Sequence, residues 1–100
     1  MASSQFNNPY AKDVKIITYQ GATTNVAAGQ GTYISLAKQG SDDLTNYTFY
    51  GVASANTGNG GILIRAYDGV PTTPPYMQVH NVTSGALNAA PVIKCIYVRN

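Results

Sequence analysis

Charge is scarce in this chain of 100 residues. Lys, Arg, Asp and Glu together make up 10% of it, against roughly 25% in an average soluble domain. Glutamate and tryptophan are absent, and there is one cysteine and one histidine. A single cysteine excludes an internal disulfide framework. The basic residues are scattered and the net charge is only +2, so the basic patch that nucleic-acid binding requires is missing.

Groups that carry catalysis are equally few. His80 lies in the middle of an expected strand, Cys95 lies in an apolar one, and no Gly-x-Ser-x-Gly nucleophile motif occurs. One His and one Cys cannot build a zinc site within a single chain. Asp42 and Asp43 lack the spacing of a calcium loop, which favours a solvated turn, although an ion on a three-fold axis would need only one Asp per chain. We therefore expect no enzyme, no cofactor and no metal site.

Targeting and spanning segments are also missing. No apolar run approaches the ~20 residues that cross a bilayer, which predicts no membrane insertion. The first residues contain no basic segment followed by an apolar one, so we expect no signal peptide and synthesis in a reducing cytoplasm. Residues 1–12, with the breaker Asn8-Pro9, are expected to be a lead-in segment. Residues 13–100 are expected to form a single domain.

β-Branched and aromatic residues dominate the apolar set, which favours strands. Gly-, Asn- and Pro-bearing turns recur every 8–15 residues, which predicts an all-β fold: an antiparallel β-sandwich or jelly roll of about seven to eight short strands. The loop Ala27–Gly31 is expected to close a hairpin between its two flanking strands, and Thr83–Pro91 is expected to be a loop of small residues. The expected strands are Val14–Gln20, Ala22–Val26, Thr32–Leu36, Asn46–Ala53, Ile62–Tyr67, Tyr76–Val82 and Val92–Arg99.

Several strands carry apolar residues on both faces, and alternation is poor in Ile62–Ile64 and in Val92–Val98. An isolated antiparallel sheet usually keeps one polar, solvated face. Such strands either lie at the centre of the core or have one face covered by another subunit. The second alternative predicts a subunit interface that includes Leu63, Ile93 and Tyr97.

The eight tyrosines are the remaining candidates for function. Tyrosine offers a large, rigid contact surface and is favoured in binding sites, but it is also simply a good strand residue. Binding loops of sandwich domains lie at strand ends, where Ser54–Gly61 and Asp68–Pro75 are expected. The predicted ligand-binding residues are Asn56, Asn59, Tyr67, Asp68 and Tyr76.

Five segments together carry a resemblance to a known group of domains. They are Asn25–Gly29, Thr32–Leu36, Tyr50–Ser54, Gln78–Thr83 and Val92–Arg99. Their turns and strand ends resemble those of the small β-sandwich domains that end bacteriophage tail-fibre and head-fibre proteins. The resemblance covers about residues 14 to 99 and contains no catalytic signature.

The resemblance implies a homotrimeric viral structural module located in the virion. Its expected partners are copies of itself, other virion proteins and a host surface receptor or glycan. The expected function is binding of that receptor by a fibre tip. One alternative is a free-standing capsid decoration protein whose function is particle contact. Another is a small hydrolase or lyase that uses residues shared between subunits.

Overall fold

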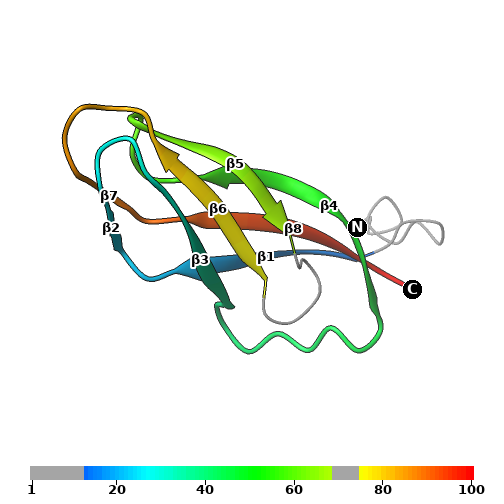
Figure 1. Ribbon diagram of the computed structural model, residues 1–100. Coiled ribbons are helices and arrows are strands. Elements are labelled where there is room, and N and C mark those ends of the chain that lie inside the picture. The colour runs from blue at the N-terminus through cyan, green and yellow to red at the C-terminus, as the bar shows by residue number, and fades with distance from the viewer. Residues whose placement is uncertain (1–12, 69–74) are drawn as a thin grey trace, which may run out of the picture.

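The computed structural model describes residues 13–68 and 75–100 (Figure 1). Their secondary structure is entirely strand, turn and loop. No helix in these two ranges is long and apolar enough to cross a membrane. The strands are β1 (Val14–Gly21), β2 (Thr24–Val26), β3 (Gly31–Lys38), β4 (Tyr47–Asn56), β5 (Ile62–Asp68), β6 (Tyr76–Asn81), β7 (Leu87–Ala89) and β8 (Val92–Arg99).

Six strands form one sheet in the order β4-β8-β1-β3-β6-β5, and β2 pairs with β7 in a second, small sheet. Every neighbouring pair is antiparallel. The expected all-β, antiparallel sandwich-like class is therefore confirmed. The larger sheet supplies both layers because it bends back on itself.

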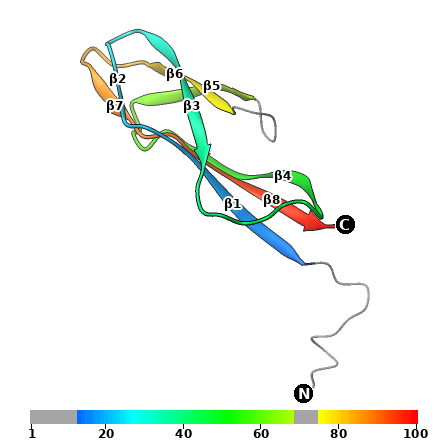
Figure 2. The same cartoon turned by 90° about the horizontal axis from the view of Figure 1, so that it is seen from below.

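The bend lies between β1 and β3. These two strands share only three residue pairs, which join Tyr19–Gly21 to Leu36–Lys38. The sheet thus consists of a first half, β4-β8-β1, and a second half, β3-β6-β5. Figure 2 shows the second half displaced along the first, so that the molecule is long and thin, 57 × 25 × 19 Å.

One hydrophobic core joins the two halves. Side chains alternate along a strand, and on β8 the residues Ile93, Cys95 and Tyr97 are buried while their neighbours face outward. The same alternation buries Ile17 and Tyr19 on β1. The buried hydrophobic residues are Ile17, Tyr19, Val26, Ile34, Leu36, Ile62, Met77, Val79, Ala89, Ile93, Cys95 and Tyr97.

The expected hairpin across Ala27–Gly31 is wrong. The turn exists: Gly29 has φ +70° and the Gln30 amide donates to the Ala27 carbonyl at 3.1 Å. Its flanking strands part, however, because β2 pairs with β7 and β3 pairs with β1 and β6. β7 lies inside the expected loop Thr83–Pro91. The sequence did not predict this strand, because three residues are too few to show a periodic pattern.

Candidate binding surfaces

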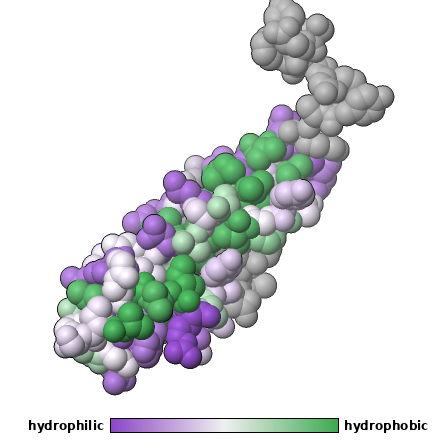
Figure 3. All heavy atoms as spheres, turned by 90° about the horizontal axis from the view of Figure 1, so that it is seen from above, coloured by the Kyte–Doolittle hydropathy of each residue, from purple (hydrophilic) through white to green (hydrophobic). Residues whose placement is uncertain are grey.

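The outer face of the first half-sheet carries an apolar patch. Val14 on β1 lies directly opposite Val98 on β8, and Ile16 lies opposite Ile96. Val14 and Ile16 are 56% and 53% exposed, and their two partners are half-buried. We call these four residues the apolar patch. Figure 3 shows one side of the molecule without distinguishing single residues, and on that side hydrophobic side chains form a broken band along its length.

Polar residues and one cation border the apolar patch. Thr18 and Lys94 form the next outward-facing pair of β1 and β8, and Ser54 of β4 lies opposite Lys94. Beside the patch, an irregularity between Phe49 and Gly51 accompanies a Tyr50 side chain that is 76% exposed. The patch therefore has an aromatic neighbour on one flank and a single positive charge at one end.

Both edge strands of the six-stranded sheet are irregular. β4 carries two register shifts, between Phe49 and Gly51 and between Val52 and Ser54, and β5 carries one between Ile64 and Ala66. Bulges twist an edge and hinder pairing with another strand. The sheet is thus poorly suited to edge-to-edge extension, whereas the described residues leave its outer face uncovered.

The outer face of the second half-sheet is aromatic and polar. Tyr33 on β3 is 64% exposed and lies opposite Gln78 on β6. Its ring meets the ring of Tyr76 edge to face, with 5.3 Å between centroids and 67° between planes. His80 and the 53%-exposed Leu63 form the next pair on this face. We call Tyr33, Tyr76, Gln78, His80 and Leu63 the tyrosine patch.

Gly31 shapes the tyrosine patch through a close approach of backbone and side chain. It lies directly opposite His80, and a Cβ at Gly31 would stand 3.2 Å from the imidazole Nδ1 and 2.9 Å from the Val79 carbonyl oxygen. The absence of a side chain at Gly31 therefore leaves space for the His80 ring. The predicted ligand-binding residues did not include Tyr33. The alternation of the expected strand Thr32–Leu36, which places Tyr33 on the outward face, is the sequence signal that could have identified it.

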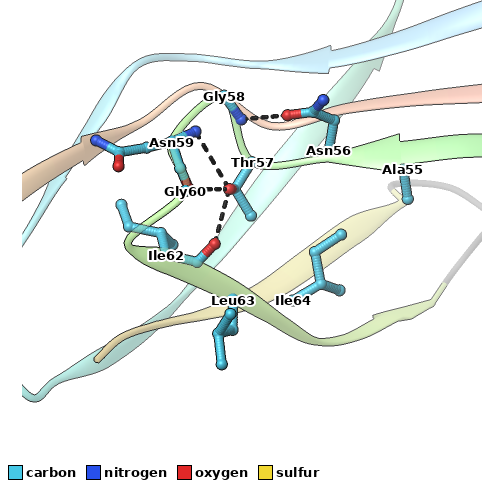
Figure 4. A pocket seen from close by; sticks show the side chains of 9 residues that line it. All are labelled: Ala55, Asn56, Thr57, Gly58, Asn59, Gly60, Ile62, Leu63 and Ile64. Carbon is cyan, nitrogen blue, oxygen red and sulfur yellow. Dashed lines mark hydrogen bonds between the residues drawn. The ribbon is translucent and has the colours of Figure 1, made fainter. Parts of the chain in front are cut away.

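Two predicted ligand-binding residues, Asn56 and Asn59, lie at the loop between β4 and β5. The loop borders an open hollow of about 640 Å³ lined by residues 55–60 and 62–64 (Figure 4). The Oδ1 atoms of Asn56 and Asn59 accept hydrogen bonds from the amides of Gly58 and Gly61, at 2.5 and 3.0 Å. These side-chain oxygens therefore brace the loop itself.

A buried threonine completes the loop. Thr57 is 6% exposed. Its hydroxyl donates a 2.8 Å hydrogen bond to the Ile62 carbonyl oxygen (Figure 4). The Thr57 carbonyl accepts a 2.7 Å bond from the Ala90 amide. The loop is thus held to the start of β5 and to the segment that precedes β8. Its hydrogen bonds stabilise the connection between these strands, in addition to shaping the surface hollow.

The other predicted ligand-binding residues lie near the opposite end of β5. Tyr76 belongs to the tyrosine patch, where its ring contacts that of Tyr33. Tyr67 is 44% exposed and lies opposite the buried Met77, so it and Tyr76 are on opposite faces of the sheet. The backbone of Asp68 pairs with Tyr76; the Asp68 side chain and residues 69–74 of the expected loop lie outside the described residues.

The predicted interface residues separate in the structure. Leu63 faces outward within the tyrosine patch, but Ile93 and Tyr97 are 0% and 3% exposed and belong to the chain's own core. The alternation along β8 is the reason, since odd-numbered positions point inward and Ile96 and Val98 point outward. Ile93 and Tyr97 therefore cannot form a subunit contact in this fold, and the apolar patch is the corresponding outward surface.

The groups considered for catalysis remain apart. Burial raises the pKa of the Cys95 thiol, which opposes formation of a thiolate nucleophile. Within the described residues, no three His, Cys, Asp or Glu side chains are grouped to hold a metal ion.

The two adjacent aspartates have structural partners. Asp43 Oδ1 accepts from the Thr45 hydroxyl and amide, at 2.5 and 3.0 Å, and these hydrogen bonds lower the pKa of Asp43. Asp42 lies 3.5 Å from the Lys15 ammonium, which also stands 4.7 Å above the Tyr47 ring centroid. The pair thus anchors the loop before β4 to β1.

Comparison with known proteins gives no information about the function of this chain. The proposal below therefore rests on the two patches of the described residues. No protein-family model matches the chain, and neither a curated protein nor a solved structure shows significant similarity to it.

Proposed function

We propose that this chain is a non-enzymatic viral structural module, a β-sandwich subunit of a bacteriophage fibre tip that binds a host surface receptor or glycan. The observation that carries the proposal is the division of the outer sheet face into two chemically different patches. The apolar patch, centred on Ile16 and Ile96, suits a permanent contact. The tyrosine patch, centred on Tyr33 and Tyr76, suits recognition of a partner that comes and goes.

The tyrosine patch combines the features of a recognition surface. Tyr33 offers most of its ring to solvent, while the edge-to-face contact with Tyr76 holds that ring in place, so little entropy is lost on binding. The Gln78 amide and the His80 imidazole lie on the same face as hydrogen-bonding groups. A flat aromatic surface flanked by such groups fits the apolar face and hydroxyls of a sugar ring or a polar protein epitope.

The experiment measures binding of fluorescently labelled full-length chain to bacterial cells and to an array of bacterial surface glycans. We expect saturable binding that Tyr33→Ala weakens by at least tenfold. Tyr50→Ala is the matched control, because it removes a tyrosine that lies outside the tyrosine patch and is even more exposed, at 76% against 64% for Tyr33. Binding that is equally sensitive to both changes, or no binding to any surface, argues against the receptor role.

The apolar patch also supports a second function, that of a capsid decoration protein whose contact with the particle is its purpose. A particle protein could cover Val14 and Ile16 in the same way as a subunit could. Co-sedimentation with purified phage particles tests this function. Stoichiometric binding that Ile16→Asp abolishes and Tyr33→Ala preserves favours decoration over receptor binding.

A further inference from the structure

We infer that Asn59 deamidates spontaneously in the native fold, by attack of the Gly60 amide nitrogen on its side chain, and that this change weakens the loop between β4 and β5. Such a modification site needs no enzyme, and it is independent of the proposed function. Asn59 is the only asparagine of the chain that a glycine follows directly. Because glycine has no side chain, the nitrogen that attacks is not crowded by its own residue.

The reaction consumes one water molecule and releases ammonia. Hydroxide removes the amide proton of Gly60, and the nitrogen forms a bond to Asn59 Cγ, which gives a tetrahedral intermediate with its negative charge on Oδ1. The Cγ–Nδ2 bond then breaks, and Nδ2 takes a proton from water, regenerates hydroxide and leaves as ammonia. Water opens the resulting succinimide ring at either carbonyl. The products are aspartate and isoaspartate.

One hydrogen bond holds the reacting atoms together. The Gly61 amide donates to Asn59 Oδ1 at 3.0 Å, which is the turn that an asparagine side chain forms with the backbone two residues further on. The ring that this hydrogen bond closes contains both Asn59 Cγ and the Gly60 nitrogen. The side chain is therefore folded back over the peptide that attacks it, which reduces the entropy lost in reaching the transition state.

Two backbone amides lie where negative charge develops. Loss of the Gly60 proton spreads charge onto the Asn59 carbonyl oxygen of the same peptide, and that oxygen accepts from the Ile62 amide at 3.0 Å. The intermediate carries its charge on Asn59 Oδ1, which accepts from the Gly61 amide. Donors that are already in place at such positions stabilise the charged states. The loop thus favours both the deprotonation and the attack.

The attacking group is accessible to hydroxide and water. Gly60 is exposed and Asn59 is half-buried, and the Asn59 side chain points away from the Thr57 hydroxyl (Figure 4). No hydrogen bond joins the Gly60 amide to another of the described residues. Its proton can therefore be removed without breaking a bond of the fold.

Asn56 provides an internal comparison within the same loop. Its Oδ1 accepts from the Gly58 amide at 2.5 Å, so its side chain makes the same kind of turn. The residue that follows is the buried Thr57, whose β-branched side chain crowds the nitrogen that would attack. We therefore expect Asn56 to persist under conditions that convert Asn59.

Isoaspartate should weaken the loop more than aspartate does. In isoaspartate the main chain runs through Cβ and Cγ, so the oxygen that accepted from the Ile62 amide becomes part of a free carboxylate. That hydrogen bond joins the loop to the first residue of β5. Aspartate keeps the original backbone, and its carboxylate can still accept from the Gly61 amide. Either product lowers the net charge of +2 by one, so ion exchange separates it from the starting chain.

Mass spectrometry of the full-length chain during incubation at about pH 8 tests the reaction. Native and urea-unfolded samples are digested at intervals, and fragmentation of the peptides locates each deamidated asparagine by its gain of about one dalton. We expect Asn59 to convert at least as fast in the native as in the unfolded chain, and Asn56 to convert at least tenfold more slowly than Asn59. A slower native rate at Asn59, or comparable native rates at both positions, overturns the inference.

Gly60→Ala tests the route through the backbone nitrogen. The added methyl group crowds that nitrogen, yet a Cβ at Gly60 meets nothing within 4 Å, so the fold should be kept, which circular dichroism verifies. We expect native conversion of Asn59 to slow at least tenfold. Gly85→Ala is the matched control, because a Cβ there also meets nothing within 4 Å and no asparagine precedes it. Undiminished conversion in Gly60→Ala would mean direct hydrolysis of the side-chain amide and overturns the inference.

Thermal unfolding tests the weakening of the loop. The isoaspartate form should melt at least roughly 4 °C lower than the Asn59→Asp variant, which carries the same charge on an unaltered backbone. Equal melting temperatures overturn this part of the inference. Receptor binding enters none of these measurements, so the inference and the proposed function fail separately.

Discussion

The hydroxyl oxygens of Tyr19 and Tyr97 lie 2.7 Å apart in a buried hydrogen bond. The two residues are on adjacent strands, and the pair Ile17 and Cys95 lies between them in the register. Each hydroxyl thus satisfies the other inside an otherwise apolar layer, which lets two large side chains be buried without an unpaired polar atom. The Phe49 ring packs edge to face on Tyr97, with centroids 5.7 Å apart.

Replacing one tyrosine of this pair should cost more than replacing both. Tyr97→Phe leaves the Tyr19 hydroxyl buried without its partner, so we expect the free energy of unfolding to fall by about 1–3 kcal/mol. The double change to Phe should recover part of that loss, because neither polar atom remains. A double-mutant cycle by urea denaturation measures the coupling; strictly additive losses would show that the hydroxyls do not interact.

Stability should decline at alkaline pH. Burial first, and then the hydrogen bond to Tyr19, raise the pKa of Tyr97 above its ordinary value of 10.0. The unfolded chain therefore releases this proton at lower pH than the folded chain does, and linkage lowers the free energy of unfolding as the pH rises above about 10. Denaturation at pH 8, 10 and 11 checks this. Tyr97→Phe should show a shallower decline, and an identical decline would contradict the assignment.

The buried thiol should be unreactive in the native state. Cys95 is 0% exposed and burial raises its pKa, so both access and thiolate formation are opposed. We expect reaction with an aromatic disulfide reagent at pH 8 to be about a hundredfold slower, or more, in native than in urea-unfolded protein. Ser54→Cys supplies an exposed thiol for comparison, and equal native rates for the two thiols would refute the burial.

Asn81 should be the most sensitive polar position of the described core. Its fully buried amide donates to the Val26 and Gly85 carbonyls, both at 2.9 Å, and accepts from the Thr83 amide at 2.8 Å. Asn81→Ala removes all three hydrogen bonds from a buried position, so we expect a loss of about 2–4 kcal/mol in thermal or urea unfolding.

The exposed pair of Asn25 and Asn88 supplies the control for that measurement. The Asn25 Nδ2 donates to the Asn88 Oδ1 at 3.1 Å on the surface, where water can replace the lost partner. Asn88→Ala should cost less than about 0.5 kcal/mol. Equal losses at positions 81 and 88 would remove the buried network as an explanation.

The bend of the sheet should tolerate no side chain at Gly21. A Cβ there would stand 2.8 Å from both Ile34 Cγ2 and Pro91 Cγ, and 3.0 Å from the Ser35 carbonyl oxygen. Gly21→Ala should therefore cost about 1–3 kcal/mol through overpacking. At Gly60 a Cβ meets nothing within 4 Å, so Gly60→Ala should be near neutral; the reverse order in thermal unfolding would contradict the close packing at the bend.

Much of the local structure was predictable from the chain alone. The strand that ends the chain was predicted with the bounds Val92–Arg99 that the structure shows, and the strands beginning at Val14, Ile62 and Tyr76 were located to within one residue at each end. β-Branched and aromatic runs bounded by turns carry this signal because strand formation depends on neighbouring residues. The residue pattern of Val92–Arg99 also predicted that this strand has two apolar faces.

Which of those faces is the core was decided by the tertiary structure. Ile93 and Tyr97 were predicted to contact another subunit, but the bend between β1 and β3 turns their side of β8 toward the second half-sheet and leaves Ile96 outside. The pairing of β2 with β7 was likewise determined by contacts between residues distant in sequence. A periodic pattern specifies that a strand has two faces, whereas the packing of strands distant in sequence determines which face is buried, and hence where the apolar and tyrosine patches lie.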